Sequence, residues 1–202
     1  MTLAAPPVRT LTAGAPLTRA KAAVIMLHGR DATAQGILSL ADVLAYPDLH
    51  YLAPQAPGGS WYPASFLAPL QDSEAALSRA LAAIAALSDG LSDAGFSSER
   101  TVLIGFSQGG CLGLEYVARN ARRYGAVAGL SAGLIGPENT PRNYGARCRA
   151  PPCSSAAAMW IPTSPLPARR RPPVCCANSA PTSRRGSIPA WATPSTMTRS
   201  AR

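Results

Sequence analysis

Gly105-Phe106-Ser107-Gln108-Gly109 is the stretch that decides how this chain folds. It follows Arg100-Thr101-Val102-Leu103-Ile104, whose β-branched and apolar residues predict a buried strand. After it, residues 108–120 carry apolar side chains at roughly helical spacing. A serine between glycines at such a strand-to-helix junction is typical of a nucleophile elbow, a sharp turn that lifts the hydroxyl above a parallel sheet. An ordinary structural turn is the alternative, since glycine and serine are common in loops.

The sequence around this stretch predicts strands that alternate with helices. Apolar runs favour strands at residues 22–27, 50–53, 100–106 and 126–131, and helical periodicity marks residues 32–45 and 71–94. This alternation is typical of an α/β protein with a doubly wound, mostly parallel sheet. Ligands of such sheets bind at the carboxyl ends of the strands, where Ser107 and the loop after Leu27 are expected to meet.

Ser107 has no obvious catalytic partners in the chain. A serine hydroxyl becomes a nucleophile when a histidine takes its proton, and a carboxylate usually orients that histidine. With an elbow of this kind the chain order is serine, then the acid, then the histidine. Both histidines, His28 and His50, precede Ser107, and the last acidic residue is Glu138. We therefore assign no triad acid and no triad histidine in this chain.

The composition changes abruptly near residue 145. Residues 1–145 hold all ten acidic residues and ten basic ones, whereas residues 146–202 hold nine Arg and no Asp, Glu, Lys or His. The formal charge of +9 thus lies in residues 146–202, together with ten of the twenty Pro and four of the five Cys. One interpretation is a disordered basic tail that binds nucleic acid or an anionic surface. The other is translation of a GC-rich gene in a wrong frame, which yields Arg, Pro, Ala and Ser without Lys.

The genetic code favours the second interpretation. Read from the third base of each codon, residues 152–164 can encode Val-Phe-Leu-Gly-Cys-Ser-Asp-Val-Asp-Pro-His-Ile-Pro, a strand-like run that ends in an acid-bearing loop. In the same frame, residues 186–200 can encode Ile-Tyr-Pro-Gly-Met-Gly-His-Thr-Val-Asn-Asp-Asp-Glu-Ile, which offers a Gly-His loop. The acid precedes the histidine, as a triad of this order requires. We therefore interpret the chain as frameshifted between about Tyr144 and Arg149, in the gene or in its recorded sequence.

Several stretches resemble the phospholipase/carboxylesterase family of α/β-hydrolases, a group that includes acyl-protein thioesterases. They are Ala23-Val24-Ile25-Met26-Leu27-His28-Gly29, Ala53-Pro54-Gln55-Ala56, Trp61-Tyr62-Pro63, the elbow extended to Gly110, and Leu130-Ser131-Ala132-Gly133. The resemblance covers residues 20–143. It implies an α/β-hydrolase core over residues 1–145, truncated after the strand that follows the elbow helix. The composition and the codon reading predict an out-of-frame, unstructured tail over residues 146–202. The resemblance also implies hydrolysis of carboxylic esters or thioesters through an acyl-serine intermediate.

Candidate site residues come from the chemistry and from the resemblance together. Ser107 is expected to carry the acyl group, and the backbone N–H of Gln108, at the start of a helix, is expected to donate to the oxyanion. By resemblance, the second oxyanion donor is the backbone N–H of Arg30. The Arg30 side chain either contacts an anionic group of the substrate or is solvated. His28 is expected to order its loop rather than to act as the base, and His50 to be a surface or half-buried side chain.

Trp61, Tyr62 and Phe66 lie in a loop rich in Pro and Gly and are candidates for a substrate pocket. We expect Trp61 and Tyr62 to bind substrate, with packing of the loop onto the core as the alternative. Cys111 is expected to be a small buried residue. No cofactor is expected, and no metal site, because the cysteines after residue 145 lack partnered spacing and histidines.

The expected partner is a small-molecule or lipid ester, with no nucleic acid, and homodimer formation is left open. No apolar stretch is long enough to cross a bilayer, and residues 1–19 lack the apolar core of a signal peptide, so a cytoplasmic location is expected. Two alternatives to an esterase remain. One is a truncated, non-catalytic product, and the other is a hydrolase-like body whose basic tail binds nucleic acid or anionic surfaces.

Overall fold

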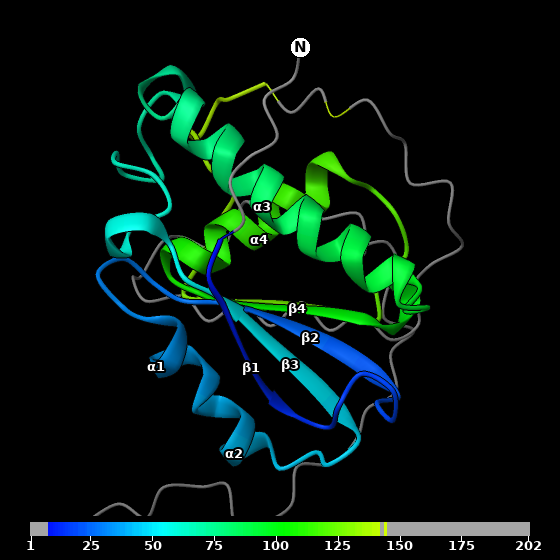
Figure 1. Cartoon of the computed structure of the whole chain (residues 1–202). Helices are drawn as coiled ribbons and strands as arrows, with labels where there is room; N and C mark the ends of the chain where they lie inside the picture. The colour runs from blue at the N-terminus through cyan, green and yellow to red at the C-terminus, as the bar shows by residue number, and fades with distance from the viewer. Residues whose placement is uncertain (1–7, 142–143, 145–202) are drawn as a thin grey trace, which may run out of the picture.

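Strands of one mixed sheet run through the centre of the molecule, as the computed structural model shows for residues 8–141 and Tyr144 (Figure 1). The strands are β1 (Thr10–Gly14), β2 (Ala22–Leu27), β3 (Leu49–Pro54), β4 (Thr101–Phe106) and β5 (Ala126–Leu130). Their order in the sheet is β1-β3-β2-β4-β5, with β1 antiparallel to β3 and every other pair parallel. The prediction of an α/β protein with a mostly parallel sheet is confirmed.

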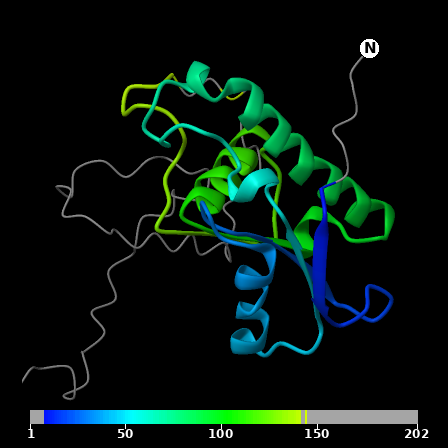
Figure 2. The same cartoon turned by 60° about the vertical axis from the view of Figure 1, so that its left-hand side comes forward.

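Helices cover both faces of the sheet, which is therefore doubly wound (Figures 1 and 2). On one face lie α1 (Ala34–Leu38) and α2 (Leu40–Leu44), and on the other lie α3 (Glu74–Asp93) and α4 (Gln108–Arg119). Short 3-10 turns occur at η1 (Pro57–Gly59), η2 (Leu70–Asp72) and η3 (Ser98–Arg100). The helix predicted over residues 32–45 is divided at Ser39. The Ser39 hydroxyl donates to the Gly36 carbonyl at 2.8 Å, and local side-chain bonds of this kind compete with the backbone hydrogen bonds of a helix.

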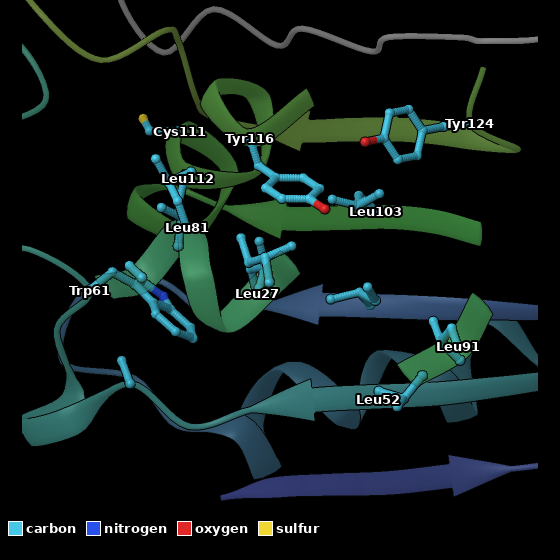
Figure 3. Packing of buried hydrophobic residues seen from close by; sticks show 14 of the residues in the cluster. Leu27, Leu52, Trp61, Leu81, Leu91, Leu103, Cys111, Leu112, Tyr116 and Tyr124 are labelled. Atoms are coloured by element: carbon cyan, nitrogen blue, oxygen red, sulfur yellow. The ribbon is translucent and has the colours of Figure 1, made fainter. Parts of the chain in front are cut away.

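Strand β2 is buried on both faces because its side chains alternate between two cores. Ile25 and Leu27 point to the core beneath α3 and α4, where Leu27 lies near Leu103 and Leu112 (Figure 3). Val24 and Met26 point to the opposite core, beneath α1 and α2. Each fully buried side chain of this size contributes about 1.5–3 kcal/mol to folding. The end of β2 is consequently one of the best-fixed points of the molecule.

Successive strands are added on opposite sides of β2. The chain passes from β2 to β3 on one side, then returns across β2 to place β4 on the other side. Leu27 and Gly105 pair at the carboxyl ends of these two strands. In open α/β sheets such a switch point leaves a crevice for ligands, because the flanking loops run to opposite faces. The elbow at residues 105–109 lies at this crevice.

Two further features of the fold differ from the sequence predictions. Strand β1 was not predicted, because five residues ending in Gly14 carry little signal before they pair with β3. The prediction of a surface or half-buried His50 was wrong. His50 is buried, and its Nδ1 lies 2.7 Å from the Ala15 carbonyl oxygen, because the connection after β1 covers it. The predictions for the frameshift and for residues 146–202 fall outside the described residues.

Candidate active site

Ser107 occupies a strained turn between β4 and α4. Its backbone has φ 50° and ψ −117°, a conformation that a residue with a side chain adopts at a cost of about 1–3 kcal/mol. The surrounding structure holds it there: the Ser107 N–H donates to the Leu130 carbonyl at 2.8 Å, and the Cys111 N–H donates to the Ser107 carbonyl at 2.9 Å. The half-buried side chain therefore stands at the carboxyl end of β4, as an elbow requires.

Two glycines let α4 start in direct contact with the sheet. A Cβ on Gly109 would lie 2.4 Å from the carbonyl oxygens of both Leu27 and His28. A Cβ on Gly105 would lie 2.4 Å from the Gly109 carbonyl oxygen. No side chain fits at either position without moving the backbone. The glycines of the elbow are thus required by close approach, and they bring the first turn of α4 against the end of β2.

The loop after β2 abuts Ser107. A Cβ on Gly29 would lie 3.5 Å from the Ser107 Cβ, and Arg30 is the next residue. The N–H of Gln108 opens α4 and so has no acceptor within the helix. Among residues 8–141 and Tyr144, neither this N–H nor that of Arg30 donates to another group. The structure thus brings two backbone donors without protein acceptors to the neighbourhood of one serine.

His28 is a structural member of this loop. It is 1% exposed, its Nε2 accepts the Ala56 N–H at 3.0 Å, and its Nδ1 lies 2.7 Å from the Gly29 carbonyl oxygen. Because Nε2 accepts a hydrogen bond, Nδ1 carries the ring proton and donates it. The lone pair that a general base needs is already used. His28 therefore orders the loops after β2 and β3, in keeping with its expected role.

The side chains of Arg30 and Gln108 hold a loop that the sequence did not connect to them. We call residues 59–64 the aromatic loop. Arg30 donates through Nη1 to the Pro63 carbonyl at 2.9 Å and through Nη2 to the Ala64 carbonyl at 2.7 Å. The Arg30 side chain is exposed, as the expectation of a solvated side chain requires, and it also makes two hydrogen bonds to the loop that the sequence did not predict. Bonds between residues 33 or 34 positions apart leave no periodic signal in a sequence.

Trp61 and Tyr62 are buried within the aromatic loop, at 4% and 2% exposure. Trp61 donates through Nε1 to the His28 carbonyl at 2.8 Å, and its indole belongs to the core cluster that also contains Leu81 (Figure 3). Burial, followed by the neighbouring Cys111 thiol, raises the pKa of the Tyr62 hydroxyl. Burial likewise raises the pKa of the Cys111 thiol, which is buried as expected. Both aromatic residues thus pack against the core, and their substrate-binding role stays a prediction.

A cavity of about 300 Å³ lies between the aromatic loop and α3. Trp61 and Tyr62 form part of its wall, and the lining on the helix side includes Ala76, Arg79 and Ala80. Ser107 is not among the lining residues. The two aromatic residues therefore lie between this cavity and the elbow network, connected to the latter through Gln108 and His28.

Large apolar side chains are exposed around the carboxyl edge of the sheet. Phe106, directly before Ser107, is 48% exposed, and Leu67 is 58% exposed. Phe66 is 38% exposed, and its ring lies 3.5 Å from where a Cβ on Gly133, just after β5, would stand. An apolar rim of this kind fits a substrate that carries a hydrocarbon group.

Neither His28 nor His50 is placed to accept a proton from Ser107. His28 is engaged as above, and His50 pairs with Ala23, at the amino end of the strands, away from Leu27. Among the described residues, no cluster of His, Cys, Asp or Glu could hold a metal ion. In the same part of the chain, no helix has the length and apolar character needed to cross a membrane.

Comparisons with known proteins agree with this geometry. Residues 12–152 match the family model described as Phospholipase/Carboxylesterase. A phospholipase/carboxylesterase from Dyadobacter fermentans is similar in structure, with 44% identity, a TM-score of 0.67, and coverage of 72% of this chain and 69% of that one. Esterase PE8 (24% identity, TM-score 0.53, 64% and 66% coverage) and acyl-protein thioesterase 2 from Zea mays (21%, 0.50, 63% and 63%) share the fold. This chain thus spans 63% to 69% of the length of these three proteins.

Proposed function

Because this chain belongs to the phospholipase/carboxylesterase family, we propose that Ser107 is the nucleophile of a carboxylic ester or thioester hydrolase. The observation that carries the proposal is the strained φ of Ser107 beside two backbone N–H groups that have no acceptor among the described residues. A turn of this energy persists only where the fold over-determines it, and such turns cluster at functional sites. The N–H groups of Gln108 and Arg30 supply the electrostatic part of catalysis.

In the proposed reaction, the Ser107 Oγ attacks the carbonyl carbon of the ester while its proton passes to a base. The carbonyl π bond breaks, and the resulting oxyanion accepts hydrogen bonds from the Gln108 and Arg30 N–H groups. Collapse of this intermediate expels the alcohol or thiol, which takes up a proton, and leaves an acyl-serine. Water then attacks the acyl-serine carbonyl and loses a proton to the base. The second oxyanion intermediate collapses, the carboxylic acid leaves, and Ser107 regains its proton.

The substrate class is proposed from the apolar rim. Phe66 and Phe106 are exposed at the edge where Ser107 lies, which favours a small-molecule or lipid ester over a strongly charged compound. We also propose that Trp61 and Tyr62 contact substrate when it is bound. Homodimer formation and a cytoplasmic location stay predictions.

The missing base makes a quantitative test possible. A chain in which codons after about 145 are read in the shifted frame can regain an acid and a histidine in the required order. Loss of triad members lowers kcat by about 10⁴–10⁶. We therefore expect little or no turnover by the chain as it stands, and turnover by the frame-restored chain.

The experiment follows hydrolysis of p-nitrophenyl butyrate by both chains, each with and without Ser107→Ala. Supporting results are turnover by the frame-restored chain that Ser107→Ala abolishes, and a rate lower by about 10⁴ in the chain as it stands. A frame-restored chain without Ser107-dependent turnover would defeat the proposal. Equal Ser107-dependent rates in the two chains would show that the frame is irrelevant. Sequencing the gene through codons 140–202 checks the frame independently.

The rival proposal of a nucleic-acid-binding protein predicts a different response. Nine Arg in residues 146–202 would give polynucleotide binding that weakens steeply with salt, since each phosphate contact releases a counterion. Binding to a random double-stranded DNA between 50 and 200 mM NaCl, measured by fluorescence anisotropy, decides this point. Tight, salt-sensitive binding without any hydrolysis would favour the rival.

A further inference from the structure

We propose that the Gln108 side chain is a positioning residue that fixes the aromatic loop to the elbow, so that one residue sets both an oxyanion donor and a wall of the substrate site. The effect of Gln108 on substrate binding rests on the proposed function, whereas its hold on the aromatic loop rests on the observed contacts alone. Gln108 is 6% exposed, although it is a polar residue in the first turn of a helix. A buried carboxamide is costly unless its polar atoms are paired.

Both ends of the carboxamide are paired, and all partners lie in the aromatic loop. Oε1 accepts the Trp61 N–H at 2.9 Å, and Nε2 donates to the Tyr62 carbonyl at 2.7 Å. The Ser60 hydroxyl lies 3.3 Å from Oε1 and 3.2 Å from Nε2. Because the Trp61 group is a donor and the Tyr62 group an acceptor, only one orientation of the amide fits.

The contacts require a carboxamide of this length. A carboxylate would set a negative oxygen against the Tyr62 carbonyl oxygen, 2.7 Å from the present nitrogen, and the two would repel. A protonated carboxyl would restore the pattern, since it has one O–H donor and one carbonyl acceptor. A thioether of the same length would make neither bond. Glutamine is therefore specified by hydrogen bonding rather than by size.

The loop is held at a second point by the residue that carries the other oxyanion donor. Arg30 binds the carbonyl groups of Pro63 and Ala64, and the Asp31 N–H donates to Gly59 at 2.9 Å. The side chains of both predicted oxyanion residues thus contact the aromatic loop, and their N–H groups have no acceptor in the part of the chain that the structure describes. A shift of the loop would move Trp61 and Tyr62 relative to Ser107, and misplacement of about 1 Å lowers rates markedly.

The test uses the full chain and reads the Trp61 amide by hydrogen exchange. This amide has Gln108 Oε1 as its acceptor, so exchange reports the contact directly. We expect Gln108→Met to speed exchange of the Trp61 amide at least tenfold at every pH. Gln108→Glu should do so at pH 8 and regain protection as the pH falls through the range where the new carboxyl binds a proton. The matched control is Gln71→Glu, an exposed position that should leave exchange unchanged.

A second readout connects the loop to the site. Binding of N-(4-nitrophenyl)butyramide, the unreactive amide analogue of the test ester, is followed by NMR line broadening. Gln108→Glu should weaken binding at least fivefold at pH 8 and recover at low pH, which a general loss of stability would not do. Urea midpoints of all variants identify any that fail to fold, and in that case Gln108→Glu at low pH serves as the folded comparison.

The outcomes separate the two proposals. Unchanged Trp61 exchange in both folded Gln108 variants, or no recovery of Gln108→Glu at low pH, overturns the positioning role. Altered exchange with unaltered binding also overturns it, because the loop would then not form part of the site. If the unmodified chain does not bind the analogue at all, the proposed function fails, and the exchange result alone decides the structural part.

Discussion

Replacing Gly109 by alanine tests whether close approach of α4 to β2 shapes the site. The new Cβ would lie 2.4 Å from two backbone oxygens, whereas ordinary contacts begin at 3.4 Å, so α4 must retreat by about 1 Å. Because the neighbours are backbone atoms, they cannot rotate away, and the strain is near the upper end of overpacking costs, about 3 kcal/mol. The higher helix propensity of alanine offsets less than about 1 kcal/mol of this strain. We expect a net loss of about 2 kcal/mol.

Gly90 provides the matched control within α3. A Cβ there would meet nothing within 4 Å, so Gly90→Ala should stabilise the protein by about 0.5–1 kcal/mol. The two identical substitutions should therefore differ by about 3 kcal/mol in the free energy of unfolding. Urea denaturation followed by circular dichroism measures both, provided the slopes agree. A Gly109→Ala variant as stable as Gly90→Ala would refute the reasoning, and with it the tight seating of the elbow.

Three further predictions concern the same region. The free energy of unfolding of Ser107→Gly should exceed that of Ser107→Ala by about 1 kcal/mol, because glycine adopts φ 50° freely. Equal urea midpoints of the two variants would contradict backbone strain at Ser107. His28→Ala should cost about 2–3 kcal/mol, since the Ala56 N–H loses its acceptor and the Trp61 ring loses a neighbour 5.1 Å away; a loss below about 0.5 kcal/mol would be inconsistent with this role. Because burial raises the pKa of the Cys111 thiol in the folded state, stability should be complete below the unfolded value of 9.0 and decline above it as the pH rises through the native pKa. Between these two pKa values the free energy of unfolding should fall by about 1.4 kcal/mol per pH unit. Cys111→Ala should flatten this pH dependence, as measured by urea denaturation.

The sequence predicted those elements that carry their own periodic signal. The residues of β2 are apolar throughout, and the strand-like and helix-like stretches on either side of Ser107 favoured a strand-to-helix turn over an ordinary loop, so both could be placed from the sequence. Strand β1 could not, because its few residues become a strand only by pairing with β3. The division of the helix at Ser39 was also missed, because the periodicity of residues 32–45 gives no sign of it.

The site was harder to predict than the fold. The backbone groups of Gln108 and Arg30 were proposed from their place after the elbow and after β2. Their side-chain contacts with the aromatic loop were missed, because each joins residues that lie far apart in the chain. For Trp61 the sequence could not choose between substrate contact and packing, and the packing is now evident from its exposure of 4%.

The pairing of β2 with β4 has a consequence for synthesis on the ribosome. Ala23 pairs with Thr101, so one edge of β2 stays uncovered until most of the described chain has left the ribosome. Until then Ile25 and Leu27 lack α4, and the uncovered edge can recruit another strand. A nascent chain that pauses within α3 thus exposes this edge for longer, and we expect slow codons placed there to lower the yield of folded protein.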